Sequence, residues 1–343
     1  MGAPCVYIVE LDSQSPCSEY GDTSLAEKLS FVLTAAEEQD SVHASELILM
    51  GTGTSVGVPV VGCGCPVCTS TNPRNKRTRS GVLVKAPLGE FVIDTGPELR
   101  LQLLWNHATL IRAALFTHAH ADHIMGLDDL RICSFQLEER AIQTARTLAE
   151  QSGDIFDEEA FLKAHPVRLP LFCEEVVESS LRQTFQYAFD DGLELSHRFA
   201  IPRLEFQRIA PGVSQDVLGL NVLPIRLMHG KLPVLGFRIG DVAFCTDVSS
   251  IPAESRPLLE GLDTLILDAL RYEPHPTHMH VDLAVKWAER LAPRRTILTH
   301  MSHELEYQTL LQELPMGVEP GYDGLSVPLQ TTIDVIGYTP ELE

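Results

Sequence analysis

The chain has 343 residues, of which 44% are hydrophobic and 21% charged, so it can bury the core of one large α/β domain or of two smaller ones. Its 47 acidic and 26 basic residues give a formal charge of −21. Because such an acidic surface repels polyanions, we do not expect nucleic acid as a partner. No apolar run is long enough to span a membrane, and the first residues lack the basic segment and apolar core of a signal peptide. We therefore expect a cytoplasmic protein with no membrane partner.

The first 45 residues differ from the rest of the chain. They form an acidic N-terminal extension of unknown role, with a short helix expected near residues 24–38. From Glu46 the pattern becomes regular, and we assign residues 46–343 to one domain. Apolar runs flanked by turn residues predict strands at residues 47–50, 81–86, 90–94, 113–116, 169–172, 220–227, 235–239, 242–245, 264–267 and 296–298.

Helices are predicted where apolar residues recur every three or four positions. This spacing occurs at residues 283–291 and again at residues 307–314, and Pro315 ends the second helix. Residues 136–164 are charged and weakly helical, which indicates an insertion into the domain. Strands interspersed with helices in both halves of the chain predict a mixed α/β fold.

Four side chains suited to metal binding lie within six residues, in Thr117-His-Ala-His-Ala-Asp-His123, directly after a predicted strand. His118 and His120 leave the strand on one face, because alternate side chains of a strand share a face. Asp122 and His123 follow in the turn and can point at the same place. Imidazole and carboxylate together suit Zn, Mn or Fe, so the segment predicts a metal site.

Three more residues of these types each follow a predicted strand. They are His229, after an apolar run, Asp247, which closes Val242-Ala-Phe-Cys-Thr-Asp, and His300, which closes Thr296-Ile-Leu-Thr-His. A single histidine or aspartate at a strand end is often a cap or a surface residue. Together with the first cluster, however, the three match one metal-binding rim that could hold two ions.

Cysteines cluster in a second place. Of the eight cysteines, Cys63, Cys65 and Cys68 lie within six residues, which is too close for an ordinary set of disulfides. Clustered cysteines in a chain without an export signal indicate metal binding.

The HxHxDH motif, the later His, Asp and His, and the upstream Ile93-Asp94-Thr-Gly resemble the metallo-β-lactamase superfamily over residues 46–330. The resemblance implies an αββα sandwich with two divalent ions, Mn or Zn, along one edge, and a positioning role for Asp94. The ligands that it implies for the first ion are His118, His120 and His229. Those for the second ion are Asp122, His123 and His300, with Asp247 bridging both ions.

Within the superfamily, the segment Cys63-Gly-Cys65-Pro-Val-Cys68 after a GTG loop resembles the phosphoribosyl 1,2-cyclic phosphate phosphodiesterase branch, which is PhnP-like. Members of that branch complete a structural zinc site with a histidine three residues after the last catalytic-site histidine. His303 occupies this position. Three thiolates and one imidazole make a closed tetrahedral zinc site.

The same resemblance implies that His278, in Pro274-His-Pro-Thr-His278, contacts phosphate and protonates the leaving oxygen, a task that suits histidine. His275 and His280 are close rivals for this role. The local basic cluster at residues 74–79 could touch phosphate, although a solvated loop is the preferred interpretation.

The predicted function is hydrolysis of a small, cyclic phosphodiester by hydroxide held between two divalent ions, with His278 and Asp122 as catalytic residues. A small anionic substrate is compatible with the acidic surface, because bound cations reverse the charge locally. A tRNA 3′-processing endonuclease, a C–N or thioester hydrolase, and a non-catalytic cofactor-biosynthesis binding protein of the same fold remain as alternatives. The oligomeric state is left open, with a homodimer as one option.

Overall fold

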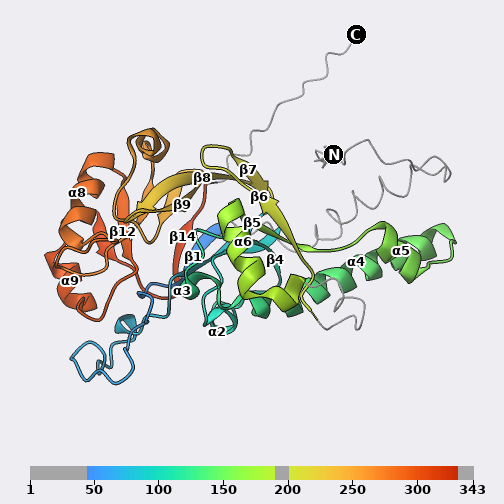
Figure 1. Cartoon of the computed structure of the whole chain (residues 1–343), viewed down its shortest axis with the longest axis horizontal. Coiled ribbons are helices and arrows are strands. Elements are labelled where there is room, and N and C mark those ends of the chain that lie inside the picture. Colours follow the sequence, from blue (N-terminus) through green and yellow to red (C-terminus); the bar gives the residue numbers. More distant parts are fainter. Residues whose placement is uncertain (1–44, 190–200, 331–343) are drawn as a thin grey trace, which may run out of the picture.

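The computed structural model describes residues 45–189 and 201–330, so the helix expected near residues 24–38 lies outside the described residues. Two seven-stranded sheets lie face to face, and helices cover their outer faces (Figure 1). Within the described residues, no helix combines the length and apolar character that a membrane crossing requires.

The first sheet has the strand order β14-β1-β2-β3-β4-β5-β6. Its strands are β1 (Glu46–Gly51), β2 (Gly81–Ala86), β3 (Gly89–Ile93), β4 (Ile111–Leu115), β5 (Leu169–Cys173), β6 (Leu204–Arg208) and β14 (Leu325–Pro328). The strands from β3 to β6 pair in parallel, so their carboxyl ends lie at the same edge of the sheet.

The second sheet has the order β13-β12-β11-β10-β9-β8-β7. Its strands are β7 (Gln215–Val217), β8 (Leu220–His229), β9 (Leu232–Ile239), β10 (Val242–Cys245), β11 (Thr264–Asp268), β12 (Arg295–Thr299) and β13 (Val318–Pro320). The strands from β10 to β13 are parallel, and β8 runs in the same direction because it is separated from β10 by one antiparallel strand.

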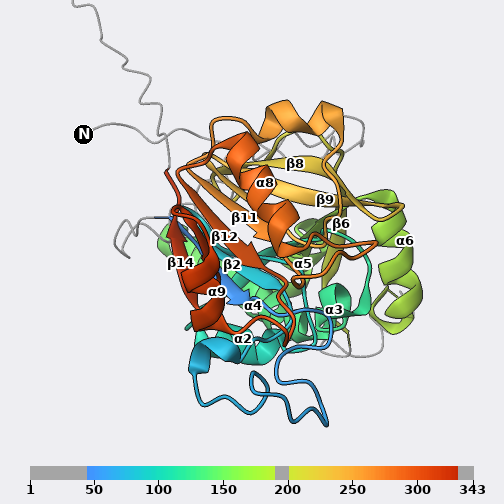
Figure 2. The same ribbon diagram turned by 90° about the vertical axis from the view of Figure 1, so that its left-hand side faces the viewer.

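Three apolar clusters hold four layers together. The middle cluster lies between the sheets and contains Phe91, Phe237 and Phe244, which are at most 1% exposed. The second joins the first sheet to α2 (Leu99–Trp105), α4 (Leu130–Ser152) and α6 (Glu175–Thr184). The third joins the second sheet to α8 (Val281–Leu291) and α9 (Tyr307–Glu313), which lie on its outer face in Figure 2. The predicted αββα sandwich is therefore confirmed.

Most predicted elements are present with boundaries shifted by one to three residues. The structure also contains β6, β7, β13, β14, α2 and α6, which the sequence pattern did not indicate. The described chain also contains the short helix α3 (Ala121–Ile124) and the 3-10 helices η1 (Pro73–Asn75), η2 (Leu127–Asp129), η3 (Gln186–Phe189) and η4 (Ala253–Leu259).

The segment predicted to be an insertion, residues 136–164, is more helical than its sequence suggests. It forms most of α4 and all of α5 (Glu158–Ala164). Small and apolar residues such as Ala141, Ile142 and Ala145 bury one face of α4, whereas α5 has no buried residue. The far end of α4 and α5 project from the sandwich in Figure 1, away from the sheet edge that carries the candidate ligands.

Candidate functional site

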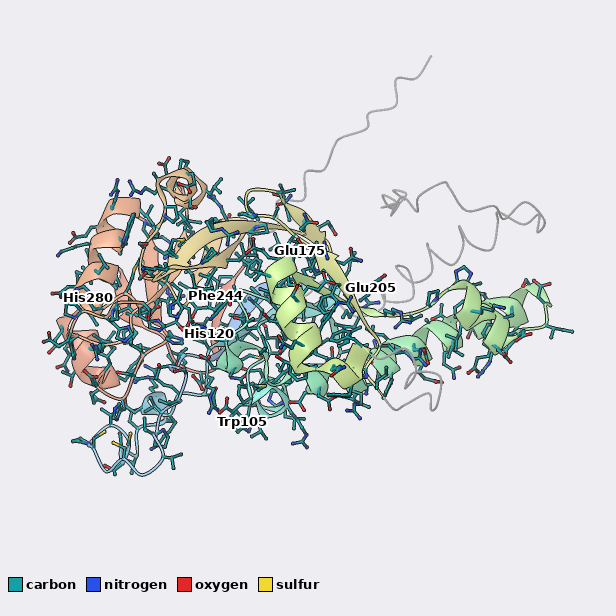
Figure 3. The ribbon with its side chains drawn as sticks, viewed as in Figure 1. Trp105, His120, Glu175, Glu205, Phe244 and His280 are labelled. Atoms are coloured by element: carbon teal, nitrogen blue, oxygen red, sulfur yellow. The ribbon has the colours of Figure 1, made fainter. Side chains whose placement is uncertain are left out.

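The predicted ligands lie together at one edge of the sandwich, where strands of both sheets end. The first sheet contributes His118, His120, Asp122 and His123, which follow β4. The second sheet contributes His229, Asp247 and His300, at the ends of β8, β10 and β12. His120 lies near the middle of the molecule in Figure 3. The expectation that Asp122 and His123 lie in a turn is wrong: both belong to the short helix α3, which still aims them at the other ligands.

Three residues of this edge have a left-handed backbone. The φ angle is 66° at Asp94, 52° at Asp247 and 58° at His300. This conformation costs a non-glycine residue about 1–2 kcal/mol, because its Cβ crowds the following carbonyl. Surrounding contacts must therefore hold these residues in place, as is common at functional sites.

Asp247 is the residue that the ligand groups share. Its Oδ1 lies 3.2 Å from both His123 Nε2 and His300 Nδ1, and its Oδ2 lies 3.9 Å from His118 Nε2. Asp122, on the other side of His123, places Oδ2 3.2 Å from the same Nε2 atom. The predicted second set of ligands and the bridging aspartate thus surround one point.

The predicted first set is less compact than expected. His118 Nε2 and His120 Nδ1 are 2.9 Å apart, and both group with Asp247. His229 groups instead with Asp247 and His278. Its ring centroid is nevertheless 5.2 Å from that of His120. Its Nδ1 donates to Thr277 O at 2.7 Å, which leaves Nε2 available to a metal ion.

Asp94 makes the contacts that the positioning role implied by the resemblance requires. Its Oδ2 lies 2.7 Å from His123 Nδ1, and its carboxylate also accepts hydrogen bonds of 2.8 Å from the backbone N–H and the hydroxyl of Thr117. The carboxylate therefore fixes the His123 ring with Nε2 facing Asp247, and it tethers the start of the histidine motif to β3.

The electrostatics favour neutral histidines beside charged carboxylates. Burial holds the pKa of His118 well below its ordinary value, and burial also lowers the pKa of His120 and of His300. Burial alone would raise the pKa of Asp247, but His300 and His123 hold it well below the ordinary value. Neutral imidazoles and ionised carboxylates are the forms that bind metals.

His123 differs from the other histidines. Burial lowers its pKa, but the charges of Asp247 and Asp94 outweigh burial and raise it well above the ordinary value. Without a cation, a proton on His123 supplies the positive charge that these buried carboxylates need. The preference of this point for positive charge is what a divalent ion would satisfy.

Whether these residues fit metal ions can be judged from the buried polar atoms that lack a hydrogen-bond partner. Asp122 Oδ2, His123 Nε2 and both ring nitrogens of His300 are buried without a hydrogen-bond partner. They approach one another closely, yet they are not aligned as donor and acceptor. Burying such atoms unpaired costs about 1–3 kcal/mol each, so the arrangement suits atoms that share a central ion. The residues present therefore fit divalent metals.

His278 lies beside the candidate ligands and has a partner of its own. Its ring stacks on His300 with centroids 4.8 Å apart, and its Nδ1 is 2.8 Å from Oδ2 of the buried Asp268. Burial lowers the pKa of His278 and raises that of Asp268 well above the ordinary value, which favours a pair without net charge. Such a pair is an imidazolium beside a carboxylate or an imidazole beside a carboxyl group. Nε2 carries a proton in the first case, and in the second case when Nδ1 accepts from the carboxyl group.

Sequence reasoning missed Asp268 and Thr277. Asp268 closes β11 in the way that Asp247 follows β10, so the search for ligands at strand ends could have found it. Thr277 acts through its backbone oxygen, which accepts from His229, and no sequence pattern indicates such a contact. His280 caps α8 through its backbone, and His275 contacts Thr277, so among the three neighbouring histidines His278 is the one that the structure pairs with a buried carboxyl group.

The predicted zinc ligands also meet. His303 Nδ1 lies 3.3 Å from Cys63 Sγ and 3.5 Å from both Cys65 Sγ and Cys68 Sγ. Zinc bonds of about 2.3 Å to sulfur and about 2.1 Å to nitrogen in a tetrahedron separate these atoms by about 3.6 Å. The backbone N–H of Cys68 lowers the pKa of the Cys65 thiol to about 6, so Cys65 is a thiolate at neutral pH. The four residues therefore fit a structural zinc ion.

The basic stretch at residues 74–79 is a solvated loop only in part, because Arg74 and Lys76 are exposed whereas Arg77 is buried. Arg77 is 1% exposed, and its guanidinium donates to Ser302 O at 3.0 Å and to Leu305 O at 2.8 Å. Burial lowers the pKa of Arg77 to about 10, so it remains charged at neutral pH. The stretch fixes the cysteine loop to the segment that carries His300 and His303.

We expect Cys65→Ser to lower stability more than catalysis. Structural zinc supplies on the order of 10 kcal/mol in small peptides and less here, because the sandwich has its own core. A loss of about 2–4 kcal/mol corresponds to a fall in Tm of about 5–10 °C. Calorimetry and zinc analysis check this, with Cys133→Ser on α4 as a control that should retain zinc. Unchanged Tm and zinc content in Cys65→Ser would show that the site is not structural.

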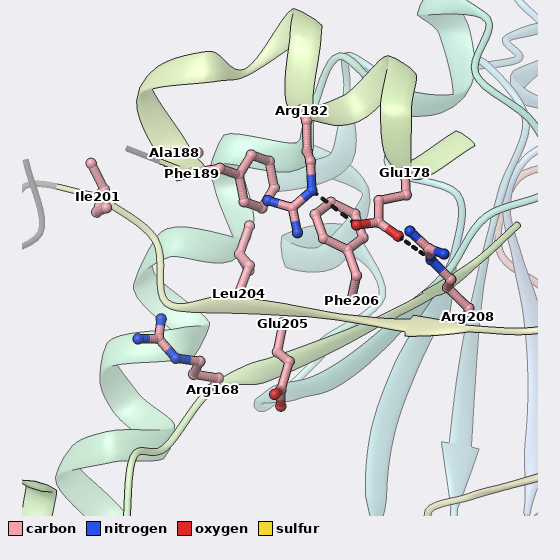
Figure 4. A pocket seen from close by; sticks show the side chains of 10 residues that line it. All are labelled: Arg168, Glu178, Arg182, Ala188, Phe189, Ile201, Leu204, Glu205, Phe206 and Arg208. Atoms are coloured by element: carbon pink, nitrogen blue, oxygen red, sulfur yellow. Dashed lines mark hydrogen bonds and ion pairs between the residues drawn. The ribbon is translucent and has the colours of Figure 1, made fainter. Parts of the chain in front are cut away.

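A pocket of about 450 Å³ lies away from these residues, beside α6, η3 and β6 (Figure 4). Arg182 and Arg208 flank Glu178 there, and both are paired with it. None of the predicted ligands lines the pocket, so it is not the candidate active site.

Comparisons with known proteins agree with this geometry. A family model described as a beta-lactamase superfamily domain matches residues 90–169 and 153–301. A solved structure described as a new diphosphatase from the PhnP family is 35% identical, with a TM-score of 0.68, over 83% of this chain and 98% of that chain. A ribonuclease Z of Mycolicibacterium gilvum is 27% identical over 71% of this chain and 84% of the relative.

An octanoyltransferase of Porphyromonas gingivalis is 34% identical over 281 residues, and the match covers 81% of this chain. It covers 50% of the relative, so the chain spans half the length of that protein. The chain covers the 35% identical PhnP-family structure almost completely. This match and the family model agree with the cluster of histidine and aspartate side chains at one edge of the sandwich. The chain therefore belongs to the metallo-β-lactamase superfamily of metal-dependent hydrolases, and within it the chain resembles the PhnP family.

Proposed function

We propose that the protein is a dinuclear metal-dependent phosphodiesterase that acts on a small, compact phosphodiester, with a cyclic phosphodiester as the preferred candidate. The observation that carries the proposal is the convergence of metal-type side chains on Asp247, with the His278–Asp268 pair beside them. Ligands alone would suit any hydrolase of the superfamily. A proton donor held beside them suits expulsion of an alkoxide from phosphorus.

The proposed ligands of one ion are His118, His120 and His229, and those of the other are Asp122, His123 and His300. Asp247 would be the residue that both sets share. Divalent ions held by these residues lower the pKa of a water molecule and offset the charge on the phosphoryl oxygens. The proposed structural zinc ligands are Cys63, Cys65, Cys68 and His303.

The chain's own residues supply orientation and a proton. His120 is exposed and His278 is half-buried, whereas His118, His123 and His300 are buried, so the substrate approaches from the side of His120 and His278. The Nε2 proton of His278 goes to the leaving oxygen. Asp268 fixes the ring through Nδ1, so Nε2 stays on the side of the candidate ligands.

The charge and the relatives support a small substrate. A net charge of −21 disfavours a long polyanion, and the 35% identical relative is described as a diphosphatase from the PhnP family. Ribonuclease Z relatives, at 27% identity, keep RNA cleavage as an outcome to test. Because the chain spans half of the octanoyltransferase relative, acyl transfer is not part of the proposal.

The test is turnover of bis(p-nitrophenyl) phosphate with and without added Mn²⁺, beside nitrocefin and a thioester. We expect hydrolysis of the phosphodiester and neither of the others. Ribose cyclic phosphates, 2′,3′-cyclic nucleotides, ADP and a tRNA precursor then rank the phosphorus substrates. Preference for nitrocefin, the thioester or the tRNA precursor would contradict the proposal, as would no turnover of any phosphorus substrate.

We expect Asp268→Asn to lower kcat on an alkoxide-leaving cyclic substrate by about 10- to 100-fold, because an amide cannot hold His278 in the same protonation state. The asparagine can still accept from Val248 N, which donates to Asp268 Oδ2 at 2.8 Å, so the local backbone should remain in place. Activity on p-nitrophenyl esters, whose leaving group needs little protonation, should change much less. Equal losses on both substrates would show that Asp268 supports the whole site rather than His278.

A further inference from the structure

Two buried hydroxyl groups connect the two sheets next to Asp247. Ser80 immediately precedes β2 in the first sheet, and Thr246 immediately follows β10 in the second sheet. Ser80 Oγ lies 3.2 Å from Thr246 Oγ1, which in turn lies 2.8 Å from Asp247 Oδ1. Both residues are 0% exposed, so neither can touch a substrate. The two hydroxyls therefore form a chain that ends on the residue that the candidate ligand groups share.

The direction of each hydrogen bond in this chain follows from its end at a carboxylate. An aspartate that binds metal ions is ionised, and an ionised carboxylate can only accept hydrogen bonds. Thr246 has a single hydroxyl proton, which it donates to Asp247 Oδ1. The Thr246 oxygen must then accept from the hydroxyl of Ser80. Ser80 thus fixes the orientation of the Thr246 hydroxyl, and Thr246 fixes the Asp247 carboxylate.

The chain acts on a particular oxygen of this carboxylate. Thr246 donates to Oδ1, which lies 3.2 Å from both His123 Nε2 and His300 Nδ1. The other oxygen, Oδ2, lies on the side of His118, 3.9 Å from its Nε2. A carboxylate oxygen has about two lone-pair directions. With one direction used by Thr246, Oδ1 keeps the other for the point where His123 and His300 meet.

The backbone of Asp247 makes such an anchor necessary. Its φ angle of 52° is left-handed, and a non-glycine residue keeps this conformation only when surrounding contacts hold it. The hydrogen bond from Thr246 is one of these contacts, and Ser80 ties it to the first sheet. The position of the Asp247 carboxylate therefore depends on both sheets.

We propose that Ser80 and Thr246 are positioning residues that direct Asp247 Oδ1 at the ion of the second ligand set, and that they set the affinity for this ion. The proposal rests on the ligand sets of the proposed function. Two effects of removing the hydroxyl oppose each other: the oxygen becomes a stronger donor to a metal ion, but it is free to turn away. At a left-handed backbone the loss of placement dominates, and removing such a partner typically lowers metal affinity about 10- to 100-fold.

Thr246→Val tests the proposal, because valine has a similar shape and lacks the hydroxyl. Full-length protein is freed of its catalytic ions by chelation, checked by elemental analysis for retained structural zinc, and titrated with Mn²⁺ in a calorimeter. We expect the affinity for one of the two Mn²⁺ ions to fall about 10- to 100-fold and that for the other to change little. Thr246→Ser, which restores a hydroxyl, should recover most of the lost affinity. Equal affinities in Thr246→Val and wild-type protein overturn the proposal.

Two ligand variants identify the affected ion. Asp122→Ala removes a ligand of the second set, and His120→Ala removes one of the first set. The binding step that Asp122→Ala abolishes should be the step that Thr246→Val weakens. The proposal is overturned if Thr246→Val weakens both steps equally, or weakens only the step that His120→Ala abolishes.

Ser80→Ala tests the other end of the chain. Its loss of Mn²⁺ affinity should be smaller than that of Thr246→Val, because Thr246 can still donate to Asp247. The double variant should match Thr246→Val alone, since Ser80 acts only through Thr246. Additive losses overturn the chain. If Thr246→Val does not fold, as judged by circular dichroism, Ser80→Ala decides: a weakened second ion supports the proposal, and an unchanged one overturns it.

The matched control is Thr264→Val. Thr264 is also a buried threonine, 1% exposed, whose hydroxyl donates to a neighbouring aspartate, Asp263 Oδ2, at 3.0 Å. It lies at the start of β11, at the opposite end of the strand from Asp268, so Mn²⁺ affinity should be unchanged. Wild-type protein that binds two Mn²⁺ ions without turning over a phosphodiester would contradict the proposed function, while the affinities of the variants would still decide this proposal. Wild-type protein that binds no catalytic ion overturns both.

Discussion

Asp247→Ala is expected to lower kcat/KM for every phosphodiester substrate by at least about 10³-fold. The loss should exceed the 10- to 100-fold that is typical when a residue that only hydrogen-bonds to a metal-binding side chain is removed. Asp247 is the residue that the candidate ligand groups share, and its two oxygens face His118, His123 and His300. Asp122 is directed at His123 and Asp268 at His278, so neither is placed to take over the contacts of Asp247. Steady-state kinetics with bis(p-nitrophenyl) phosphate and elemental analysis measure the effect.

The matched control is Asp282→Ala, which removes an exposed aspartate from the first turn of α8 and should leave activity and metal content unchanged. Asp247→Asn, which keeps the size of the side chain, should lose nearly as much activity as the alanine variant. Both Asp247 variants should remain folded, as judged by circular dichroism. A folded Asp247→Ala protein that retains more than about a tenth of the activity would contradict the bridging role.

His278→Ala has the second large expected effect. Loss of a general acid costs about 10²- to 10⁴-fold in rate, so kcat on cyclic substrates with alkoxide leaving groups should fall by this amount. On p-nitrophenyl esters the loss should be less than about tenfold, since this leaving group departs without protonation. The comparison uses purified variants with both substrate types and His280→Ala as the control, because His280 lies on the same loop and caps α8.

Two other outcomes would assign His278 a different role. A uniform loss on both substrate types would indicate that the residue binds phosphate without donating a proton. A fall in metal content would make His278 a ligand, which its closeness to His229 and Asp247 allows on distance alone. The contact between His278 Nδ1 and Asp268 at 2.8 Å leaves Nε2 free for either role, so the metal content of His278→Ala decides between them.

The sequence predicted the interior of the fold better than its edges. The central strands of both sheets are apolar runs flanked by turn residues, and each lies close to its predicted position. The missed strands β6, β7, β13 and β14 are the outer strands of the two sheets. Outer strands are short and carry polar residues, as Leu204–Arg208 does, because one side is free of a neighbouring strand. Their pairing depends on the assembled sheet and leaves little local pattern.

Some residues of the candidate site could likewise be predicted from the sequence, and others could not. The proposed ligands are of unusual residue types and follow strands, so the HxHxDH motif and the strand ends indicated them directly. Asp268 obeys the same rule but was passed over because no motif included it. Thr277 and Arg77 act through main-chain contacts formed far along the chain, 48 residues away in the case of Thr277 and His229 and 225 in the case of Arg77 and Ser302. Only packing brings such residues together.

Metal content is the most direct test of the account. Elemental analysis of the purified protein should find two catalytic divalent ions and one structural zinc ion per chain. In Cys65→Ser the structural zinc should be missing while the catalytic pair remains, and in Asp247→Ala the catalytic ions should be depleted while the structural zinc remains. No more than one metal ion per chain, in wild-type protein that hydrolyses a phosphodiester, would contradict the dinuclear site.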